Sequence, residues 1–445
     1  MEIKINIPTA ANELIHILHN HGHSAYVVGG CVRDSILGRK PNDWDICTSA
    51  RPDEMLKIFK DRKIIETGLQ HGTVTVIVDG EPFEITTYRI DGEYSDNRRP
   101  DTVTFTDKLV EDLRRRDFTI NAMAYNDTEG LIDPFNGLED IKHQKIQCVG
   151  SAKERFGEDA LRILRAIRFA AQLDFSIMPG TDWEIHQQYK NLENISVERI
   201  NSEFCKIVAS DNFCVELLLY KDVFSLFIPE LKDMFGFPHN NPWHIFDVFD
   251  HTLHAIDNCE SKDMIVRLAV FFHDFGKPHS YQDGEDGIRH FIGHWEVSVE
   301  LTDSIMKRLR FDNDTRNKVL ELIYYHDLSV KDRKDIKRLL NKIGAKQFER
   351  LLEIKRADAK AHNPIYLEER IENIDNIEQL FQEIIKNNEC FSLKDLDVNG
   401  SDLISIGYKS GRQLGYALQG LLDCVIEEEV YNNKEDLLRL AKNWL

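Results

Sequence analysis

Two aspartates, Asp43 and Asp45, are separated by a single residue and follow shortly after a glycine pair, Gly29 and Gly30. In an extended strand residues i and i+2 point to the same side, so we expect the two carboxylates to converge. Converging carboxylates repel each other unless a cation joins them, and Mg²⁺ prefers a few carboxylates together with substrate phosphates. The spacing therefore predicts a Mg²⁺ site for phosphoryl transfer.

The glycine pair ends a run of strand-forming residues, Tyr26 to Val28, and precedes a helix predicted over Cys31 to Leu37. Glycine permits a tight turn and a close approach of backbone N–H groups to a phosphate. Arg33 lies near the start of this helix, where a guanidinium can bind the same anion. The glycine turn, the arginine and the acidic pair together predict a site for a nucleoside triphosphate.

The flanking segments predict a small sheet around this site. Residues 9–22 have apolar side chains at helical spacing, and residues 72–78 and 81–90 alternate apolar and polar side chains across the turn Asp79-Gly80, which favours a hairpin. Glu84 on the second strand of this hairpin is a candidate third carboxylate. An exposed strand glutamate without a catalytic role is the alternative at this position.

Arginines follow the hairpin in two segments. Arg114, Arg115 and Arg116 precede Asp117 and an apolar run, so at least one guanidinium is a candidate to bind the triphosphate. Residues 154–170 predict a helix with three arginines at intervals of three residues: Arg162, Arg165 and Arg168. A solvated arginine face is the alternative for this helix.

Asp159, beside the first of these arginines, is a candidate for base selection. A carboxylate can accept from the exocyclic amine of cytosine or adenine, and an adjacent guanidinium can donate to the neighbouring ring nitrogen, whereas uracil and guanine present the reverse pattern. Asp159 with Arg162 is therefore suited to select CTP and ATP without a nucleic-acid template.

The order of these segments resembles that of the five motifs of the class II CCA-adding enzymes, within the tRNA nucleotidyltransferase and poly(A) polymerase family. The matching segments are VVGGCVRD, DWD, the RRP loop at Arg98-Arg99, RRRDFTINAMAY and EDALRILRAIRFA. The resemblance implies an α+β fold, with a small mixed-sheet nucleotidyltransferase head of the polymerase-β type, followed by a mostly α-helical neck. It implies addition of C, C and A to the tRNA 3′ end from CTP and ATP.

The resemblance also implies roles by position. Asp43 and Asp45 would hold Mg²⁺ in a two-metal mechanism, with Glu84 as a further catalytic carboxylate. The nucleotide would be bound by Gly29, Gly30, Arg33, Arg116, Asp159, Arg162, Arg165 and Arg168. The loop at Arg98-Arg99 favours an enzyme that adds the terminal A, because the family associates this loop with the switch from C to A. Addition of A only, addition of CC only and poly(A) polymerase activity stay open.

Residues 244–327 contain a second group of candidate ligands. Histidine and aspartate on neighbouring helices suit one or two divalent ions. His251 and the pair His273-Asp274, which precedes Phe-Gly-Lys-Pro, resemble the HD superfamily of metal-dependent phosphohydrolases, whose ligands are a first His, the His-Asp pair and a later Asp. The last ligand stays open among His294, His326 and Asp327. A helical scaffold without metal is the alternative.

Size and composition limit the possible functions. A formal net charge of -20 argues against a protein that coats nucleic acid indiscriminately, so any RNA must meet local basic patches. Eight cysteines without a C-x-x-C pair predict reduced thiols and a cytoplasmic location. The sequence shows neither a signal peptide nor an apolar run approaching about 18 residues, so no membrane partner is expected. The oligomeric state is not indicated.

We expect four domains in the 445 residues. These are the head over 1–148, the neck with the base-selecting helix over 149–240, an HD-like helical body over 241–345, and a C-terminal helical tRNA-binding body and tail over 346–445. The tail has a glycine-bounded helix start with cations suited to a backbone phosphate, formed by Gly407, Lys409, Gly411, Arg412 and Gly415. Two other functions stay open: an HD-type phosphohydrolase with a nucleotide-sensing head, and an RNA-binding scaffold without catalysis.

Overall fold

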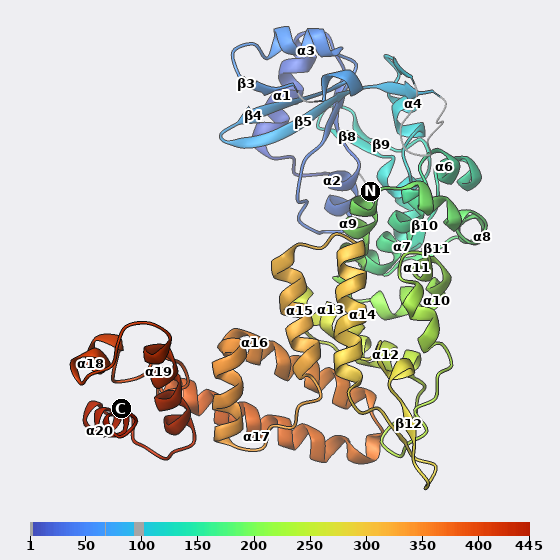
Figure 1. Cartoon of the computed structure of the whole chain (residues 1–445). Helices are drawn as coiled ribbons and strands as arrows, with labels where there is room; N and C mark the ends of the chain where they lie inside the picture. Colours follow the sequence, from blue (N-terminus) through green and yellow to red (C-terminus); the bar gives the residue numbers. More distant parts are fainter. Residues whose placement is uncertain (1–2, 67, 93–101) are drawn as a thin grey trace. The chain divides into compact units, whose positions relative to one another are not determined.

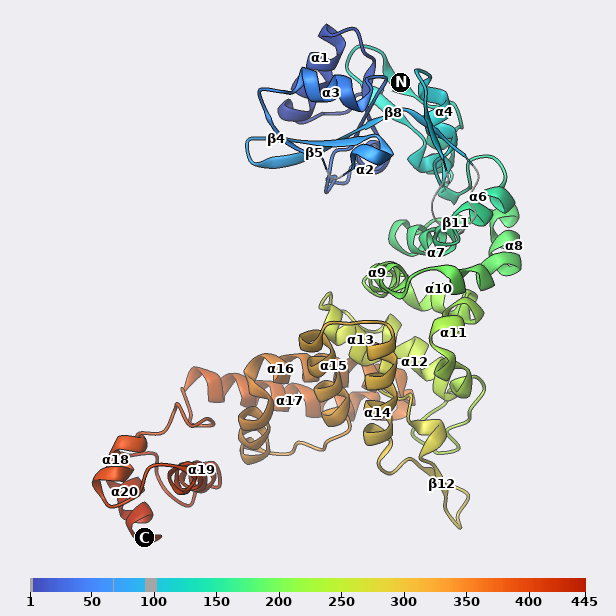
Figure 2. The same ribbon diagram turned by 45° about the horizontal axis from the view of Figure 1, so that its top comes forward.

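Residues 1–227 form one unit of the chain, and residues 228–445 form a second. The structure is a computed structural model that describes residues 3–66, 68–92 and 102–445 (Figures 1 and 2). The loop arginines Arg98 and Arg99 lie outside the described residues. The predicted division into four domains stays a prediction.

Unit 1 contains a seven-stranded mixed sheet with the strand order β3-β4-β5-β2-β1-β8-β9. β2 runs parallel to β5, and the other neighbouring strands are antiparallel. The strands are β1 (Ala25–Val28), β2 (Ile46–Thr48), β3 (Lys63–Ile65), β4 (Thr73–Val78), β5 (Glu81–Thr87), β8 (Ala124–Asn126) and β9 (Gly130–Ile132). Two smaller pairs are β6 (Arg89–Asp91) with β7 (Val103–Phe105), and β10 (Lys145–Ile146) with β11 (Ser176–Ile177). The predicted mixed-sheet head is confirmed.

The predicted hairpin is formed by β4 and β5. Asp79 and Gly80 have φ angles of 52° and 86°, the two positive values that an Asp-Gly hairpin turn requires. Every second residue of β4 is buried, so one face of the hairpin contributes to the core. Helices α1 (Thr9–Asn20) and α3 (Pro52–Ile58) pack on the strands of this sheet (Figure 1).

The acidic pair does not lie within a strand, contrary to the expectation. Asp43 and Asp45 precede β2, which begins at Ile46. The Val28 N–H donates to the Asp45 carbonyl (3.0 Å). This hydrogen bond fixes the backbone of Asp45 beside the end of β1, so strand pairing still positions the segment although it is a loop.

The rest of unit 1 is mostly helical. Its helices are α2 (Gly30–Ile36), α4 (Leu109–Arg114), α5 (Gly137–Lys142), α6 (Ala152–Glu158), α7 (Leu161–Leu173), α8 (Pro179–Gln188), α9 (Val197–Val208), α10 (Phe213–Leu219) and α11 (Lys221–Phe227). The central helix is α7, which is buried on most sides and packs against α9. Asp159 lies at the junction of α6 and α7, just before the helix that carries the three arginines.

Unit 2 is a helical body followed by a smaller helical group. The body contains α12 (Val248–Asp257), α13 (Met264–Phe272), α14 (His294–Arg308), α15 (Asn313–Tyr325), α16 (Arg333–Ala361) and α17 (Leu367–Lys386), with a short hairpin of β12 (Gln282–Asp283) and β13 (Arg289–His290). Pro364 lies between α16 and α17, and α16 also has a break at Gly344, where φ is 76°. The last helices, α18 (Gly400–Ser405), α19 (Arg412–Ile426) and α20 (Lys434–Lys442), share a hydrophobic core of their own.

Short 3-10 helices connect several of these elements: η1 (Leu69–His71), η2 (Thr119–Asn121), η3 (Tyr189–Asn194), η4 (Pro229–Met234), η5 (Lys277–His279) and η6 (Pro364–Tyr366). None of the helices within the described ranges has both the length and the apolarity that crossing a lipid bilayer requires. The predicted fold class, a mixed-sheet head followed by helices, is confirmed.

Candidate active site

The turn between β1 and α2 is shaped by Gly29. Its φ of 83° lies in the left-handed region that favours glycine. A Cβ added at this position would lie 2.9 Å from Nη1 of Arg116, so the guanidinium occupies the space that another side chain would need. Gly30, the next residue, is the first residue of α2. The turn therefore places Arg116 directly against the start of the helix that carries Arg33.

The predicted carboxylates Asp43, Asp45 and Glu84 form one acidic group. All three residues are exposed to solvent. The Asp45 carboxylate itself is partly shielded from water, and this desolvation, with the negative charges of Asp43 and Glu84, raises its pKa to about 6 against the opposing effect of Arg116. Carboxylates that raise the pKa of a neighbour are close enough to repel, and a divalent cation would relieve that repulsion. The donor set fits Mg²⁺.

A chain of hydrogen bonds connects α2 with α7. Arg33 Nη1 donates to Asn121 Oδ1 (2.6 Å), and Asn121 Nδ2 donates to Asp117 Oδ1 (3.0 Å). Arg165 Nε donates to the other oxygen of Asp117 (2.8 Å). Burial alone would raise the pKa of Asp117, but Arg165 and Asn121 outweigh burial and hold it well below its usual range. A charged Asp117 therefore connects Arg33 with Arg165.

The side chains of Asp159 and Arg162 each bind a different residue of the protein. Arg199 Nη2 donates to Asp159 Oδ2 (2.8 Å). Arg162 pairs with Glu158 and donates to the Arg115 carbonyl (2.9 Å). The backbone still joins the two predicted residues, because the Arg162 N–H donates to the Asp159 carbonyl (3.0 Å). They therefore lie side by side at the start of α7, with their side chains already oriented.

Four further residues orient the predicted site residues, and sequence motifs assign none of them a role: Asp112, Asp117, Asn121 and Arg199. Asp112 is buried and lies 2.8 Å from Arg115 and 3.5 Å from Arg116, so it orients the arginine pair. Asn121 follows Asp117 by four residues in the segment DFTIN, and this short spacing was a visible signal. Arg199 had no such signal, since it lies 40 residues after its partner.

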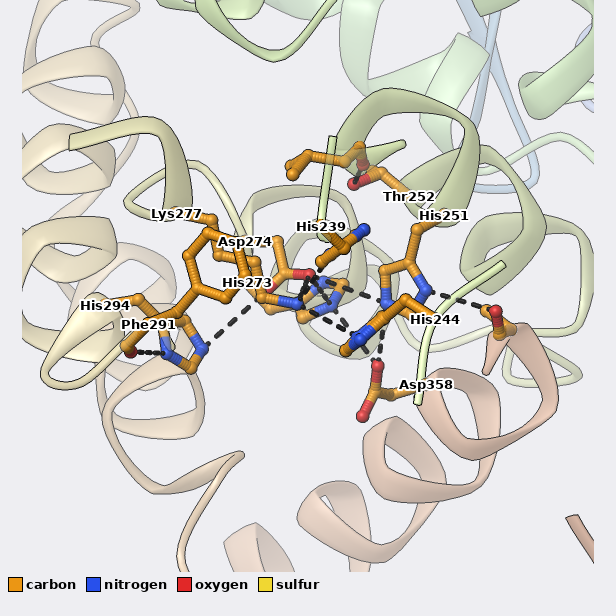
Figure 3. A network of polar contacts seen from close by, with 12 residues as sticks. His239, His244, His251, Thr252, His273, Asp274, Lys277, Phe291, His294 and Asp358 are labelled. Atoms are coloured by element: carbon orange, nitrogen blue, oxygen red, sulfur yellow. Dashed lines mark hydrogen bonds and ion pairs between the residues drawn. The ribbon is translucent and has the colours of Figure 1, made fainter. Parts of the chain in front are cut away.

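A second cluster of titratable side chains lies inside unit 2 (Figure 3). His251 comes from α12, His273 and Asp274 directly follow α13, and Asp358 comes from α16. His251 Nε2 lies 2.9 Å from Asp358 Oδ1, and His273 Nε2 lies 3.2 Å from Asp274 Oδ2 and 3.6 Å from Asp358 Oδ1. The side chains of His251, His273 and Asp358 lie close enough together to hold a divalent ion.

Asp274 also faces a second pair of imidazoles. Its Oδ1 lies 3.5 Å from His294 Nε2, which lies 3.1 Å from His326 Nε2. Two ligand atoms about 2.1 Å from one tetrahedral ion are about 3.4 Å apart, so these spacings fit a shared ion. Among the described residues, His273 Nε2 and both Asp274 oxygens are buried without a hydrogen-bond partner, although Asp274 is ion-paired with Lys277 (2.7 Å). Such atoms suit metal ligation.

The structure brings the predicted His251, His273, Asp274 and His294 together. The carboxylate in contact with His251 is Asp358, which the sequence analysis did not consider. Asp327 instead lines a cavity of about 260 Å³ that opens beside the cluster. Other residues that line this cavity include the histidines His244, His294, His326 and His362, the aromatic residues Trp243, Phe291 and Trp295, and Lys277.

An enzyme that transfers a nucleotide needs carboxylates for a divalent cation near guanidinium groups for a triphosphate. Unit 1 has both, on and beside one mixed sheet, and this defines the class of nucleotidyltransferases. Residues 25–147 match the model of the poly A polymerase head domain. Residues 174–235 match a probable RNA and SrmB-binding site of polymerase A, and residues 280–441 match a putative tRNA nucleotidyltransferase domain 2.

Relatives of this chain span nearly its whole length. The CCA-adding enzyme of Enterococcus faecalis is 32% identical over 97% of this chain and 95% of that protein, and the CCA-adding enzyme of Bacillus mycoides is 33% identical over 98% and 97%. The CCA-adding enzyme of Lactobacillus johnsonii is 50% identical over 45% of this chain and 51% of that protein. The chain belongs to the CCA-adding enzymes, a family of tRNA nucleotidyltransferases.

Solved structures agree with this assignment. The crystal structure of the Bacillus stearothermophilus CCA-adding enzyme in complex with CTP has a TM-score of 0.73 and 28% identity, covering 98% of this chain and 96% of that one. The Thermotoga maritima CCA-adding enzyme complexed with tRNA has a TM-score of 0.61 at 20% identity, covering 98% and 95%, and shares the fold. The predicted resemblance to class II CCA-adding enzymes is confirmed. The HD-type assignment of unit 2 stays a prediction.

Proposed function

We propose that the chain adds C, C and A in turn to the 3′ end of tRNA, using CTP and ATP and releasing pyrophosphate, at the site in unit 1. The observation that carries the proposal is the acidic group of Asp43, Asp45 and Glu84, where burial and the two neighbouring carboxylates raise the pKa of Asp45 while Arg116 lies close by. The names of the relatives that cover nearly the whole chain support CCA addition.

Asp43 and Asp45 hold Mg²⁺ in this proposal, and Glu84 adds negative charge to the same site. A bound Mg²⁺ would lower the pKa of the tRNA 3′-hydroxyl and offset the charge on the leaving pyrophosphate. Arg33 and Arg116 bind the triphosphate, because both guanidinium groups lie at the turn between β1 and α2. Each has a fixed orientation, through Asn121 and Asp112 respectively.

In this proposal, residues at the start of α7 select the base. Asp159 accepts from the exocyclic amine of cytosine or adenine, and Arg162 donates to the ring nitrogen next to it. Their side chains are oriented by Arg199 and Glu158, so the hydrogen-bond pattern is fixed by the protein. Arg165 and Arg168 extend the positive charge along the same helix.

The remaining parts of the chain suit a tRNA enzyme. Lys409 and Arg412 are exposed on either side of Gly411, which precedes the 15-residue helix α19, and both side chains are available to the tRNA backbone. All eight cysteines are unpaired thiols, which favours a reducing compartment, so we place the enzyme in the cytoplasm.

Three RNAs distinguish this function from its neighbours. With CTP, ATP and Mg²⁺, the purified protein is expected to add CCA to tRNA that lacks it, to add a single A to tRNA that ends in CC, and to leave generic RNA unextended. Failure on the first tRNA with success on the second would show an A-adding enzyme. Extension of generic RNA with many A residues would show a poly(A) polymerase.

The cluster in unit 2 favours a second candidate function, the hydrolysis of phosphate esters at a divalent metal. His251, His273 and Asp358 form one ligand group, and Asp274, His294 and His326 form another. The bound metal would supply an activated water, and Lys277 beside the cavity would contact the phosphate. The carboxylate of Asp274 faces both groups, which suits two ions rather than one.

Metal content and hydrolysis test this second function. We expect the protein to bind divalent metal, as measured by elemental analysis, and to cleave 2′,3′-cyclic nucleotides. His273→Ala and Asp358→Asn should lose both properties and keep normal CCA addition. Equal metal content and hydrolysis in these variants and the wild type would contradict the assignment.

A further inference from the structure

Three arginines gather around one aromatic ring in unit 1. The guanidinium carbon of Arg33 lies 4.8 Å from the centroid of the Phe169 ring, that of Arg165 lies 5.4 Å away and that of Arg168 lies 4.2 Å away. Arg33 belongs to α2, whereas the other two and Phe169 itself belong to α7. The ring is therefore the common neighbour of cations from the glycine turn and from the neck.

Cations brought this close repel one another. Burial and the charge of Arg165 lower the pKa of Arg168 to about 10, and Arg33 contributes to the same shift. Carboxylates offset part of the repulsion, since Arg165 pairs with Asp117, and Arg168 lies 3.1 Å from Glu203. The face of an aromatic ring adds a further attraction for each guanidinium, because its quadrupole places negative charge there.

The position of the ring is fixed by its surroundings. Phe169 is buried, with 4% of its surface exposed. Phe118 packs against it edge-to-face at a centroid distance of 5.7 Å and an interplanar angle of 83°. The ring is therefore a fixed surface against which the three guanidinium groups pack, in addition to their polar partners.

We propose that Phe169 is a positioning residue of the nucleotide site, whose π-system keeps Arg33, Arg165 and Arg168 assembled before the triphosphate binds. The inference rests on the proposed function of the unit 1 site. An aliphatic side chain of similar size would fill the same volume without attracting the cations. The arginines would then move apart, and the incoming triphosphate would have to reassemble them at a cost in affinity.

Fluorinated phenylalanine at position 169 separates this role from packing. Pentafluorophenylalanine keeps the shape of the ring and reverses its quadrupole, and the monofluoro and difluoro side chains weaken the quadrupole in steps. We expect the dissociation constants of CTP, ATP and inorganic tripolyphosphate, measured by calorimetry, to rise together with the number of fluorines, by about tenfold for the pentafluoro ring. The preference for CTP over UTP should stay unchanged, because Asp159 and Arg162 are not altered.

Pentafluorophenylalanine at Phe156 is the matched control. This phenylalanine on α6 is fully buried, and in the described part of the chain no guanidinium lies over its ring. Its substitution should leave the three dissociation constants as in the wild type. Thermal unfolding checks that each variant is folded. If the pentafluoro variant at position 169 does not fold, the dissociation constants of the monofluoro and difluoro variants test the role of the ring.

Unchanged tripolyphosphate affinity across the fluorinated series at position 169 would overturn the inference, as would an equal loss in the control. This outcome differs from a failure of the proposed function. In that case the wild type itself would not incorporate CMP or AMP into tRNA, whereas the calorimetric series does not depend on incorporation.

Discussion

Arg199 on α9 donates to Asp159, which lies just before α7, with 2.8 Å between Nη2 and Oδ2. The other oxygen of Asp159 accepts from the Leu161 N–H (3.1 Å). Each carboxylate oxygen has a second lone pair, so Asp159 can still accept from a nucleobase. The packing of α7 against α9 thus determines the direction in which the predicted base-selecting carboxylate points.

Removal of this ion pair should weaken base selection. In Arg199→Met the Asp159 carboxylate loses its fixed orientation, and we expect the preference for CTP over UTP, as a ratio of kcat/KM values, to fall by about tenfold, the equivalent of one charge-assisted hydrogen bond. Arg199→Lys should retain an intermediate preference. Arg39→Met, which removes an exposed arginine bonded to the Gln172 carbonyl, is the control. An unchanged CTP preference in Arg199→Met would refute the positioning role.

The glycine turn gives a second prediction. Gly29→Ala places a Cβ 2.9 Å from Nη1 of Arg116 and also strains a backbone with a φ of 83°. Gly38→Ala is its control, because Gly38 has a φ of 68° and, within the described part of the chain, no atom lies within 4 Å of an added Cβ. Both variants should lose stability from strain, Gly38→Ala by about 1–2 kcal/mol and Gly29→Ala by more, because the ψ of -127° at Gly29 lies outside the left-handed helical region. Only Gly29→Ala should raise the KM for both CTP and ATP, because only this variant displaces Arg116, the guanidinium that we propose binds the triphosphate.

Steady-state kinetics and urea unfolding of the two glycine variants test this separation. Similar KM values in both variants would mean that the clash with Arg116 has no consequence for nucleotide binding. The triphosphate would then bind away from the turn after β1.

Glu216 gives a prediction on pH and stability. It is buried on α10, its Oε2 has no hydrogen-bond partner among the residues that the structure describes, and burial together with the charge of Asp182 raises its pKa from 4.5 to about 8. Between these values the folded state keeps a proton that the unfolded state has released. The free energy of unfolding therefore falls as the pH rises through this range, by at most about 1.4 kcal/mol per pH unit.

Glu216→Gln should remove this contribution, because the amide does not titrate. We expect the urea midpoint of the variant to exceed that of the wild type increasingly between about pH 5 and about pH 8.5. Glu193→Gln, at an exposed position of the same unit, should follow the wild type. Parallel stability profiles for Glu216→Gln and the wild type would show that the carboxyl is not kept protonated.

Local signals in the sequence predicted the framework of unit 1 well. The Asp79-Gly80 turn, the helix after Gly30 and the arginine helix α7 depend on neighbours in the chain, so residue order alone reveals them. The strand expected for Asp43 to Asp45 was wrong because the spacing of two carboxylates does not distinguish a strand from the loop at its end. Their convergence with Glu84 nevertheless followed from the parallel pairing of β2 and β5.

Partners brought together by tertiary packing were not predictable in this way. Asp358 lies in a long charged helix where no motif distinguishes it from other acidic residues. Asp327, by contrast, directly follows a histidine and so matches a His-Asp pattern. Only the packing of α16 against α12 places Asp358 beside His251. Arg199 and the Phe169 ring likewise acquire their roles through contacts between helices.

The most direct test of the account is single-turnover addition of labelled AMP to tRNA that ends in CC, with Asp45→Asn compared with the wild type. Asp53→Asn, at an exposed position on α3, is the control. We expect Asp45→Asn to lose at least about a hundredfold in rate, since it removes a proposed Mg²⁺ ligand, and to keep the thermal stability of the wild type, since it removes a repelling charge. The control should be fully active. A near-normal rate of AMP addition by folded Asp45→Asn would contradict the placement of nucleotide transfer at this acidic group.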